Sequence, residues 1–202
     1  MDETRIFSKN DPKAFLLRDA MEAYAALSES TWEQIVDACH LRSVKRKECL
    51  VSIGQGTKHF FFVCKGLLRA YTVSLDGKEY TKMFFPENTF PGSIKAAITG
   101  EPSTFALEAL EDSLVIAIEH DRYRVLLKNL DDLKWYHIQY LEKNWILKKE
   151  SLQVAFALDD AGARYERFVS ENPELVGRVS LQHIASWLGI TPTQLSRIRN
   201  LG

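Results

Sequence analysis

Residues 180–199 read Ser-Leu-Gln-His-Ile-Ala-Ser-Trp-Leu-Gly-Ile-Thr-Pro-Thr-Gln-Leu-Ser-Arg-Ile-Arg, and this stretch predicts two short helices joined by a tight turn. Ser180 is suited to cap the first helix, and Gly189 supplies the left-handed residue that ends it. Thr191 and Gln194 form a capping box at the start of the second helix, which begins with a proline. The pattern is typical of a helix-turn-helix.

The second helix of this pair carries a polar outer surface suited to a DNA major groove. Leu195 and Ile198 face inward at helical spacing, which leaves hydroxyl, amide and guanidinium groups outside. From Gly177 onward the sequence has arginines but no Asp or Glu, so a basic tip stands on a chain of net charge -1. A helical hairpin that only packs on the core is the alternative. We expect Thr193, Gln194, Ser196 and Arg197 to contact bases, and Arg178 and Arg199 to contact phosphates. Thr191 caps the helix.

The composition indicates a globular protein without a membrane span. The 202 residues are 46% hydrophobic and 11% aromatic, which is enough for one domain or two small ones. No apolar run approaches the length of a membrane-spanning helix, and the first residues lack the layout of a signal peptide, so we expect a cytoplasmic location. The three cysteines form no Cys-x-x-Cys pair and the histidines are scattered, so neither disulfides nor a metal site is predicted.

The first two thirds of the chain predict an α+β structure. We expect helices over 13–27 and 28–42, the second with a capping box of Ser30 and Glu33. Asp76-Gly77 is a strong hairpin signal, and about eight short strands fit a small antiparallel roll or barrel. The strand-like runs are 49–53, 60–64, 68–74, 79–85, 103–110 and 113–119.

From Asp121 to about Leu158 the hydrophobic period is that of one long helix with two apolar faces. One stripe runs through Leu133, Tyr136, Tyr140, Leu147, Val154 and Leu158, and another through Ile138, Leu141, Trp145, Leu152 and Phe156. Two apolar faces need two partners, so we expect one face to pack on the roll and the other to pack on a second copy of the chain. A central helix buried within a monomer is the alternative. The expected dimer interface consists of Leu133, Tyr136, Tyr140, Leu141, Trp145, Leu147, Leu152 and Val154.

The order of these parts resembles the Crp/Fnr superfamily of bacterial transcription regulators. Phe61-Phe-Val-Cys-Lys-Gly-Leu-Leu-Arg69 and Asp76-Gly-Lys-Glu79 are similar to the family's β-roll, and Phe90-Pro-Gly-Ser93 falls where the family carries its phosphate-binding cassette. The resemblance implies three parts: an antiparallel β-roll sensor domain (1–130), a long dimerisation helix (131–158) and a small all-α helix-turn-helix domain without an evident wing (159–202). A ligand would act by rotating the last part about residues 159–162.

The cassette departs from the family's cyclic-AMP-binding members. Their glutamate and Arg-Ser pair correspond here to Ser93 and to Ser103-Thr104. Without an arginine a buried phosphodiester loses a charge-assisted partner worth about 1.5–3 kcal/mol, so we do not expect cyclic AMP to be the effector. The region either holds another small molecule or is filled core, and no cofactor is assigned beyond an unidentified effector. The candidate pocket residues are Phe62, Arg69, Tyr71, Phe84, Phe90, Gly92, Ser93, Ser103 and Thr104.

The sequence thus predicts a homodimeric DNA-binding transcription regulator that does not respond to cyclic AMP. Its expected partners are double-stranded DNA, a second copy of the chain and, as the resemblance allows, RNA polymerase, with no membrane. A sensor or protein-interaction module with a degenerate cyclic-nucleotide-binding domain is the alternative. We do not expect an enzyme, because no nucleophile elbow, phosphate loop or zinc-protease motif is present and the acidic pairs lie at helix boundaries.

Overall fold

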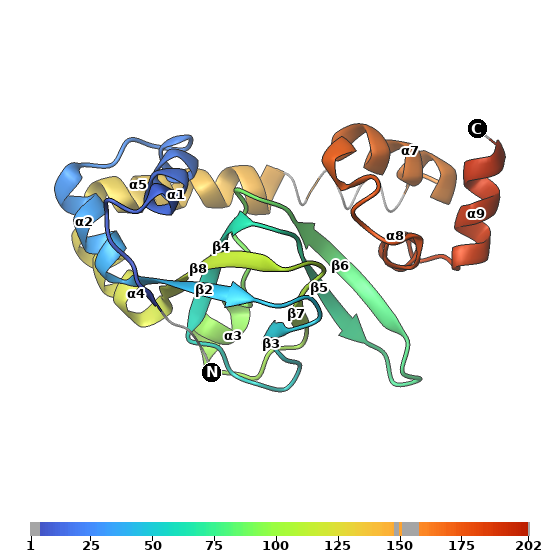
Figure 1. Cartoon of the computed structure of the whole chain (residues 1–202), viewed down its shortest axis with the longest axis horizontal. Coiled ribbons are helices and arrows are strands. Elements are labelled where there is room, and N and C mark those ends of the chain that lie inside the picture. The colour runs from blue at the N-terminus through green and yellow to red at the C-terminus, as the bar shows by residue number, and fades with distance from the viewer. Residues whose placement is uncertain (1–4, 148–149, 151–157, 202) are drawn as a thin grey trace.

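The computed structural model describes residues 5–147, 150 and 158–201, and confirms the α+β fold class. Figure 1 shows the strands in the middle, with the first two helices of the chain at one end and the C-terminal helices at the other. Antiparallel pairing joins the strands into two four-stranded sheets with the orders β1-β2-β8-β4 and β3-β7-β5-β6. The strands are β1 (Arg5–Ile6), β2 (Cys39–Val44), β3 (Cys49–Val51), β4 (His59–Lys65), β5 (Leu68–Val73), β6 (Glu79–Phe85), β7 (Ala106–Ala109) and β8 (Ser113–Glu119).

Strand β8 is buried on both faces, and its alternation divides the core in two. Val115 and Ala117 belong to the cluster between the two sheets, together with Phe61 of the neighbouring strand β4. Ile116 and Ile118 point the other way and pack against helices. Because successive strand residues face opposite sides, one short apolar strand serves both clusters. The predicted run 113–119 matches β8 residue for residue.

The predicted hairpin at Asp76-Gly77 is present between β5 and β6. Gly77 has a φ of 80°, and its N–H donates to the carbonyl of Ser74 at 2.9 Å. Glycine adopts this left-handed backbone without steric cost, which is why the Asp-Gly signal is strong. Strand β6 has the predicted bounds 79–85.

The second N-terminal helix is shorter than predicted. Helix α1 (Pro12–Glu22) is followed by α2 (Glu29–Asp37), whose cap is Ser28, with its Oγ accepting from the N–H of Thr31 at 3.2 Å. The predicted capping box of Ser30 and Glu33 is therefore wrong. The predicted helix 28–42 is also wrong beyond Asp37, because residues 39–44 form β2 and pair with β8. Apolar side chains at 39, 41 and 44 fit a strand as well as a helix.

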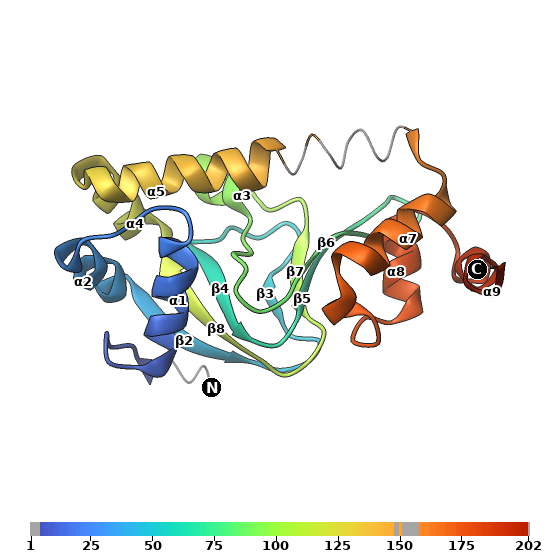
Figure 2. The same ribbon diagram turned by 90° about the horizontal axis from the view of Figure 1, so that it is seen from above.

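The long helix predicted from Asp121 is interrupted in the structure. Helix α4 (His120–Asn129) ends at Leu130, whose extended φ of -116° and ψ of 112° turn the chain before α5 (Asp131–Leu141). Asp132 holds this corner, because its carboxylate accepts from Ser28 N at 2.9 Å and from Thr31 Oγ1 at 2.8 Å. The chain continues into a π-helical segment, η1 (Glu142–Leu147). Figure 2 shows α5 lying along one side of the roll.

The C-terminal unit contains α7 (Ala161–Glu171), the 3₁₀ turn η2 (Pro173–Leu175), α8 (Leu181–Leu188) and α9 (Pro192–Leu201). Phe168, Ile184, Leu188 and Leu195 share one core cluster with Leu67 and Phe84 of the roll. Asp160 caps α7 by accepting from Ala163 N at 2.8 Å, so part of the predicted 159–162 joint is a helix cap. A short helix, α3 (Ile94–Thr99), lies in the cassette region.

Cys39, Cys49 and Cys64 are free thiols; Cys39 is buried and the other two are half-buried. Burial raises the pKa of Cys64 to about 12 and that of Cys39 further, so both thiols stay protonated near neutrality. Within residues 5–147, 150 and 158–201, no helix is both long and apolar enough to cross a membrane.

Candidate nucleic-acid interface and ligand site

Specific caps fix the geometry of the C-terminal helix pair. Ser180 Oγ accepts from His183 N at 3.2 Å at the start of α8, and Gly189 ends that helix with a φ of 73°. At the start of α9, Thr191 Oγ1 accepts from Gln194 N at 3.2 Å, and Gln194 Oε1 accepts from Thr191 N at 2.9 Å. The predicted capping box is confirmed, and α8, turn and α9 form a helix-turn-helix.

Of the seven candidate DNA-binding residues, five lie on the exposed helix α9 and a sixth, Thr191, caps its start. Leu195 is fully buried beneath α9 and Ile198 is half-buried, so the polar side chains stand on the outer face. The cap occupies Gln194 Oε1, which leaves its Nε2 amide for a base. Among the described residues, no carboxylate pairs with Arg197 or Arg199. The exposed set is Thr191, Thr193, Gln194, Ser196, Arg197 and Arg199.

Arg178, the seventh candidate, is occupied elsewhere. Its Nη1 and Nη2 each donate to the Glu87 carboxylate at 3.0 Å, and Nη2 also donates to Glu111 Oε1 at 2.7 Å. These bonds raise the pKa of Arg178 and balance its charge within the chain. The sequence predicts that Arg178 contacts phosphates, whereas in the structure Arg178 pairs with two carboxylates of the roll. We therefore leave it out of the proposed interface.

Helix α8 also docks against strand β6. Ser186 Oγ accepts from Thr81 N and donates to Glu79 O, both at 2.9 Å, so one hydroxyl satisfies two backbone groups of the strand. Next to this contact, the ring of Phe84 lies 6.0 Å from that of Phe168. These contacts hold the helix-turn-helix unit on the roll in the conformation that the structure describes.

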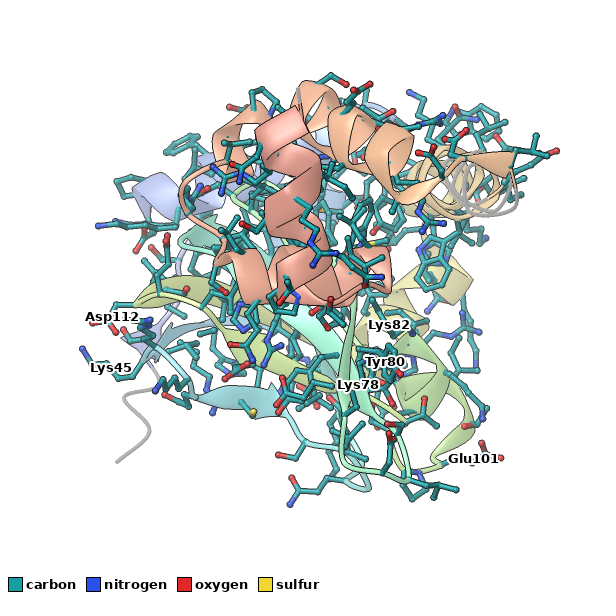
Figure 3. The ribbon with its side chains drawn as sticks, turned by 90° about the vertical axis from the view of Figure 1, so that its right-hand side faces the viewer. Lys45, Lys78, Tyr80, Lys82, Glu101 and Asp112 are labelled. Carbon is teal, nitrogen blue, oxygen red and sulfur yellow. The ribbon has the colours of Figure 1, made fainter. Side chains whose placement is uncertain are left out.

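Positive charge is also present along β6. Figure 3 shows Lys78, Tyr80 and Lys82 in a row, beneath the C-terminal helices in that view. Lys78 Nζ lies 5.0 Å from the Tyr80 ring and Lys82 Nζ lies 4.2 Å from the Phe105 ring. Both lysines are exposed, so the side of the molecule that carries α9 is more basic than the net charge suggests.

In the cassette, the hydroxyl groups of two serines form a hydrogen bond with each other. Ser93 Oγ and Ser103 Oγ share a hydrogen bond of 2.8 Å, and both residues are buried. Ser103 Oγ also donates to the carbonyl of Phe105 at 2.7 Å. A Cβ on Gly92 would come within 2.9 Å of Phe60 Cβ, so the backbone is closely packed here. The cassette is closed by its own side chains.

Arg69, the one cation among the candidate pocket residues, is engaged by acids. Its Nε donates to Glu108 and its Nη2 to Glu79, each at 2.7 Å, and its guanidinium lies 4.1 Å from the Tyr71 ring. The side chain is 4% exposed. Two carboxylates already outnumber this single positive charge, so the surroundings do not favour a phosphate.

The nine candidate pocket residues do not surround one cavity. Phe84 packs against α7, Thr104 is exposed, and Phe62 lies in the core 5.0 Å from the Phe90 ring. Of the nine, only Phe90 borders the cavity of about 140 Å³ that opens between the roll and α5. His120, Arg124 and His137 also border it, and sequence reasoning missed them because α4 and α5 were taken as one continuous helix.

The predicted dimer residues divide into buried and exposed groups. Leu133 and Tyr136 are buried in the chain's own core, and Tyr140 packs on the same cluster, so these three are not available to a second copy. Trp145 and Leu147 are exposed by 47% and 60%. Leu141 is half-buried, and Leu152 and Val154 lie outside the described residues. The structure adds three exposed apolar residues that the prediction left out of the interface: Trp135, Ile138 and Ile146.

The chain thus combines a β-roll, the helix α5 beside it and a C-terminal helix-turn-helix. The family model described as cyclic nucleotide-binding domain matches residues 41–129. This segment is therefore a domain of the cyclic nucleotide-binding type, and the chain has the fold of Crp/Fnr-type regulators. No curated protein sequence matches the chain.

Solved structures support the same fold over most of the chain. FixK2 from Bradyrhizobium japonicum has a TM-score of 0.66 at 18% identity, covering 81% of this chain and 83% of that one. The c-di-GMP-responsive global regulator CLP of Xanthomonas campestris has a TM-score of 0.66 at 17% identity, covering 86% and 91%. DNR from Pseudomonas aeruginosa has a TM-score of 0.58 at 16% identity, covering 96% and 88%. At these identities the likeness establishes the fold.

Proposed function

We propose that this protein is a homodimeric, DNA-binding transcription regulator of Crp/Fnr type that does not respond to cyclic AMP. The observation that carries the proposal is helix α9, which is capped at its start, seated on Leu195 and exposed along its polar face. Its Arg197 and Arg199 have no carboxylate partner among the described residues. Such a helix suits a major groove, where arginine pairs with guanine and amides pair with adenine.

In this proposal the two subunits bind two half-sites of one DNA duplex. Thr193, the Gln194 amide, Ser196 and Arg197 face base edges, while Arg199 lies at the phosphates. A twofold-symmetric dimer places its two helices about 34 Å apart, one helical turn of DNA, so the site is a palindrome or close to one. Lys78 and Lys82 add charge that attracts the duplex.

The exposed side of α5 and η1 supports a dimer. Trp135 and Ile138 are exposed by 55% and 44%, and Ile146 and Leu147 continue the apolar surface with exposures of 58% and 60%. Apolar side chains recurring along one helix gain free energy when a second copy covers them, at about 25 cal/mol per Å² of apolar surface buried. We propose this surface, with Trp145, as the dimer contact.

The closed cassette supports independence from cyclic AMP. The two serines that stand at the nucleotide-binding positions bond to each other, and Arg69 is held by Glu79 and Glu108. Binding a cyclic phosphate there would break these bonds without supplying an arginine in return, at a cost of at least a tenfold loss of affinity.

Selection of binding sites from random duplex DNA tests the proposal, followed by fluorescence anisotropy with the enriched site at several salt concentrations. We expect a twofold-symmetric site, a steep fall of affinity with salt, and no change on adding cyclic AMP. An interaction with little salt dependence and no enriched sequence would instead favour a protein partner. Activation by cyclic AMP would contradict the last part of the proposal.

A further inference from the structure

The cavity between the roll and α5 is walled by aromatic rings. Phe60 comes from β4, Phe90 from the segment before α3, Tyr123 from α4, Tyr136 and Tyr140 from α5, and Trp145 from η1. Its volume is about 140 Å³. An apolar cavity of about 150 Å³ takes up benzene, so this one has room for a single six-membered ring. The walls favour that ring by offset and edge-to-face contacts.

The remaining polar side chains at the cavity are cationic or neutral. Arg124, His120 and His137 border it, and no acidic residue is among its lining residues. Arg124 is exposed, and no carboxylate among the described residues pairs with it. The cavity therefore combines an apolar interior with one positive charge at its edge.

Arg124 is the permanently charged side chain among the polar groups at the cavity. Burial, and then the charge of Arg124, lower the pKa of His137, so that imidazole is neutral near pH 7. His137 Nδ1 lies 3.3 Å from the hydroxyl of Tyr123. His120 Nδ1 lies 3.4 Å from Asp121 Oδ1.

We propose that this cavity binds an aromatic carboxylate with a single ring. The ring lies among the aromatic walls, and the carboxylate lies at the edge of the cavity. There the guanidinium of Arg124 can donate two charge-assisted hydrogen bonds to it. A neutral ring lacks this pair.

Trp145 connects such a ligand to the helix that continues from α5. It borders the cavity, lies on the π-helical segment η1 and is 47% exposed. Single π-helical turns inside helices recur at functional sites. A ring beneath Trp145 would favour one arrangement of η1, and η1 belongs to the helix proposed above as the dimer contact. Only the ligand's role as an effector rests on the proposed function; its binding does not.

Titration of the free protein with benzoate by calorimetry, without DNA, tests the site. We expect one benzoate per chain, and about tenfold or greater weakening in R124Q, because the charged hydrogen-bond partner is gone. Lys128→Gln removes the same charge from an exposed position of α4 outside the cavity, and we expect its affinity to stay within twofold of the unaltered chain. Benzyl alcohol has the ring without the charge, so we expect R124Q to bind it as the unaltered chain does.

A second variant tests the cavity itself. Ile98 lines the opening and is 63% exposed, so Ile98→Trp is tolerated by the fold and narrows the entrance. We expect this variant to lose both benzoate and benzyl alcohol while keeping its thermal unfolding temperature. No benzoate binding at millimolar concentration, equal binding to R124Q, equal weakening by K128Q or undiminished binding to I98W would each overturn the proposal. Because no DNA is present, these outcomes are independent of whether the protein binds DNA.

Discussion

Arg178 and Glu87 are joined by two contacts of 3.0 Å, and this pair connects the helix-turn-helix unit to the roll. The same carboxylate accepts from Gly66 N at 2.8 Å, in the turn between β4 and β5. Arg178 also reaches Glu111, at 2.7 Å, in the turn before β8. One arginine of the C-terminal unit thus binds two turns of the roll, and the position of α8 and α9 depends on the shape of those turns.

Removing either partner should destabilise the chain, and removing both should cost less than the sum. The side chains of Arg178 and Glu87 are 28% and 34% exposed, so solvent screens the pair in part. We expect a coupling energy of about 1 kcal/mol for R178A and E87A in a double-mutant cycle of urea unfolding. Additive effects of the two substitutions would show that the pair contributes no stability of its own.

The same contact should make stability depend on acid. Burial alone would raise the pKa of Glu87, but hydrogen bonds from Arg178 and from backbone N–H groups outweigh it and hold the pKa below its ordinary value of 4.5. A group with a depressed folded-state pKa adds stability above its unfolded-state pKa and loses it as the pH falls through the folded-state pKa. We expect the free energy of unfolding to fall more steeply below about pH 4.5 in the unaltered chain than in E87Q. Parallel curves would contradict this.

Gly66 should not tolerate alanine. Its φ is 103°, and a Cβ there would lie 2.8 Å from Ser113 Cα and 2.2 Å from Ser113 Oγ. Either the backbone or β8 must shift, so we expect Gly66→Ala to cost about 2 kcal/mol or more in urea unfolding. Gly56→Ala is the matched control, because a Cβ on Gly56 meets nothing within 4 Å, and it should change stability by less than about 0.5 kcal/mol.

A charge on the exposed side of α5 should separate the proposed dimer. Ile138 is 44% exposed, so glutamate there leaves the chain's own core intact but places a charge in the contact. By light scattering we expect a mass of twice 23.1 kDa for the unaltered chain and of 23.1 kDa for I138E. Val125→Glu, at a site on α4 that is 57% exposed, should stay dimeric. A monomeric unaltered chain would contradict the proposed contact.

Local signals were enough to predict the hairpin at Asp76-Gly77, strands β6 and β8 and both caps of the helix-turn-helix, because each rests on neighbouring residues. Residues 39–42 were misassigned because a short apolar run fits either a helix or a strand, and only pairing with β8 decides between them. The break at Leu130 depends on Asp132 meeting Ser28 across the fold. Such distant partners leave no periodic signal.

The candidate site divides in the same way. The exposed polar side chains of α9 follow from the helical period, so they were predicted from the sequence. The acids that pair with Arg178 and Arg69 lie 10 to 91 positions away along the chain, from Glu79 at Arg69 to Glu87 at Arg178. The aromatic cavity brings together β4, α3, α4, α5 and η1, and only the packing of α5 on the roll creates it.

Arg197 offers the most direct test of DNA binding, through fluorescence anisotropy of the selected duplex with the unaltered chain, R197A and the remote control K128A. In a dimer Arg197 contacts bases twice, so we predict that R197A loses about 2–6 kcal/mol of binding free energy while its mass and unfolding stay unchanged. K128A should bind as the unaltered chain does. Equal affinity of R197A and the unaltered chain would contradict the claim that α9 recognises DNA.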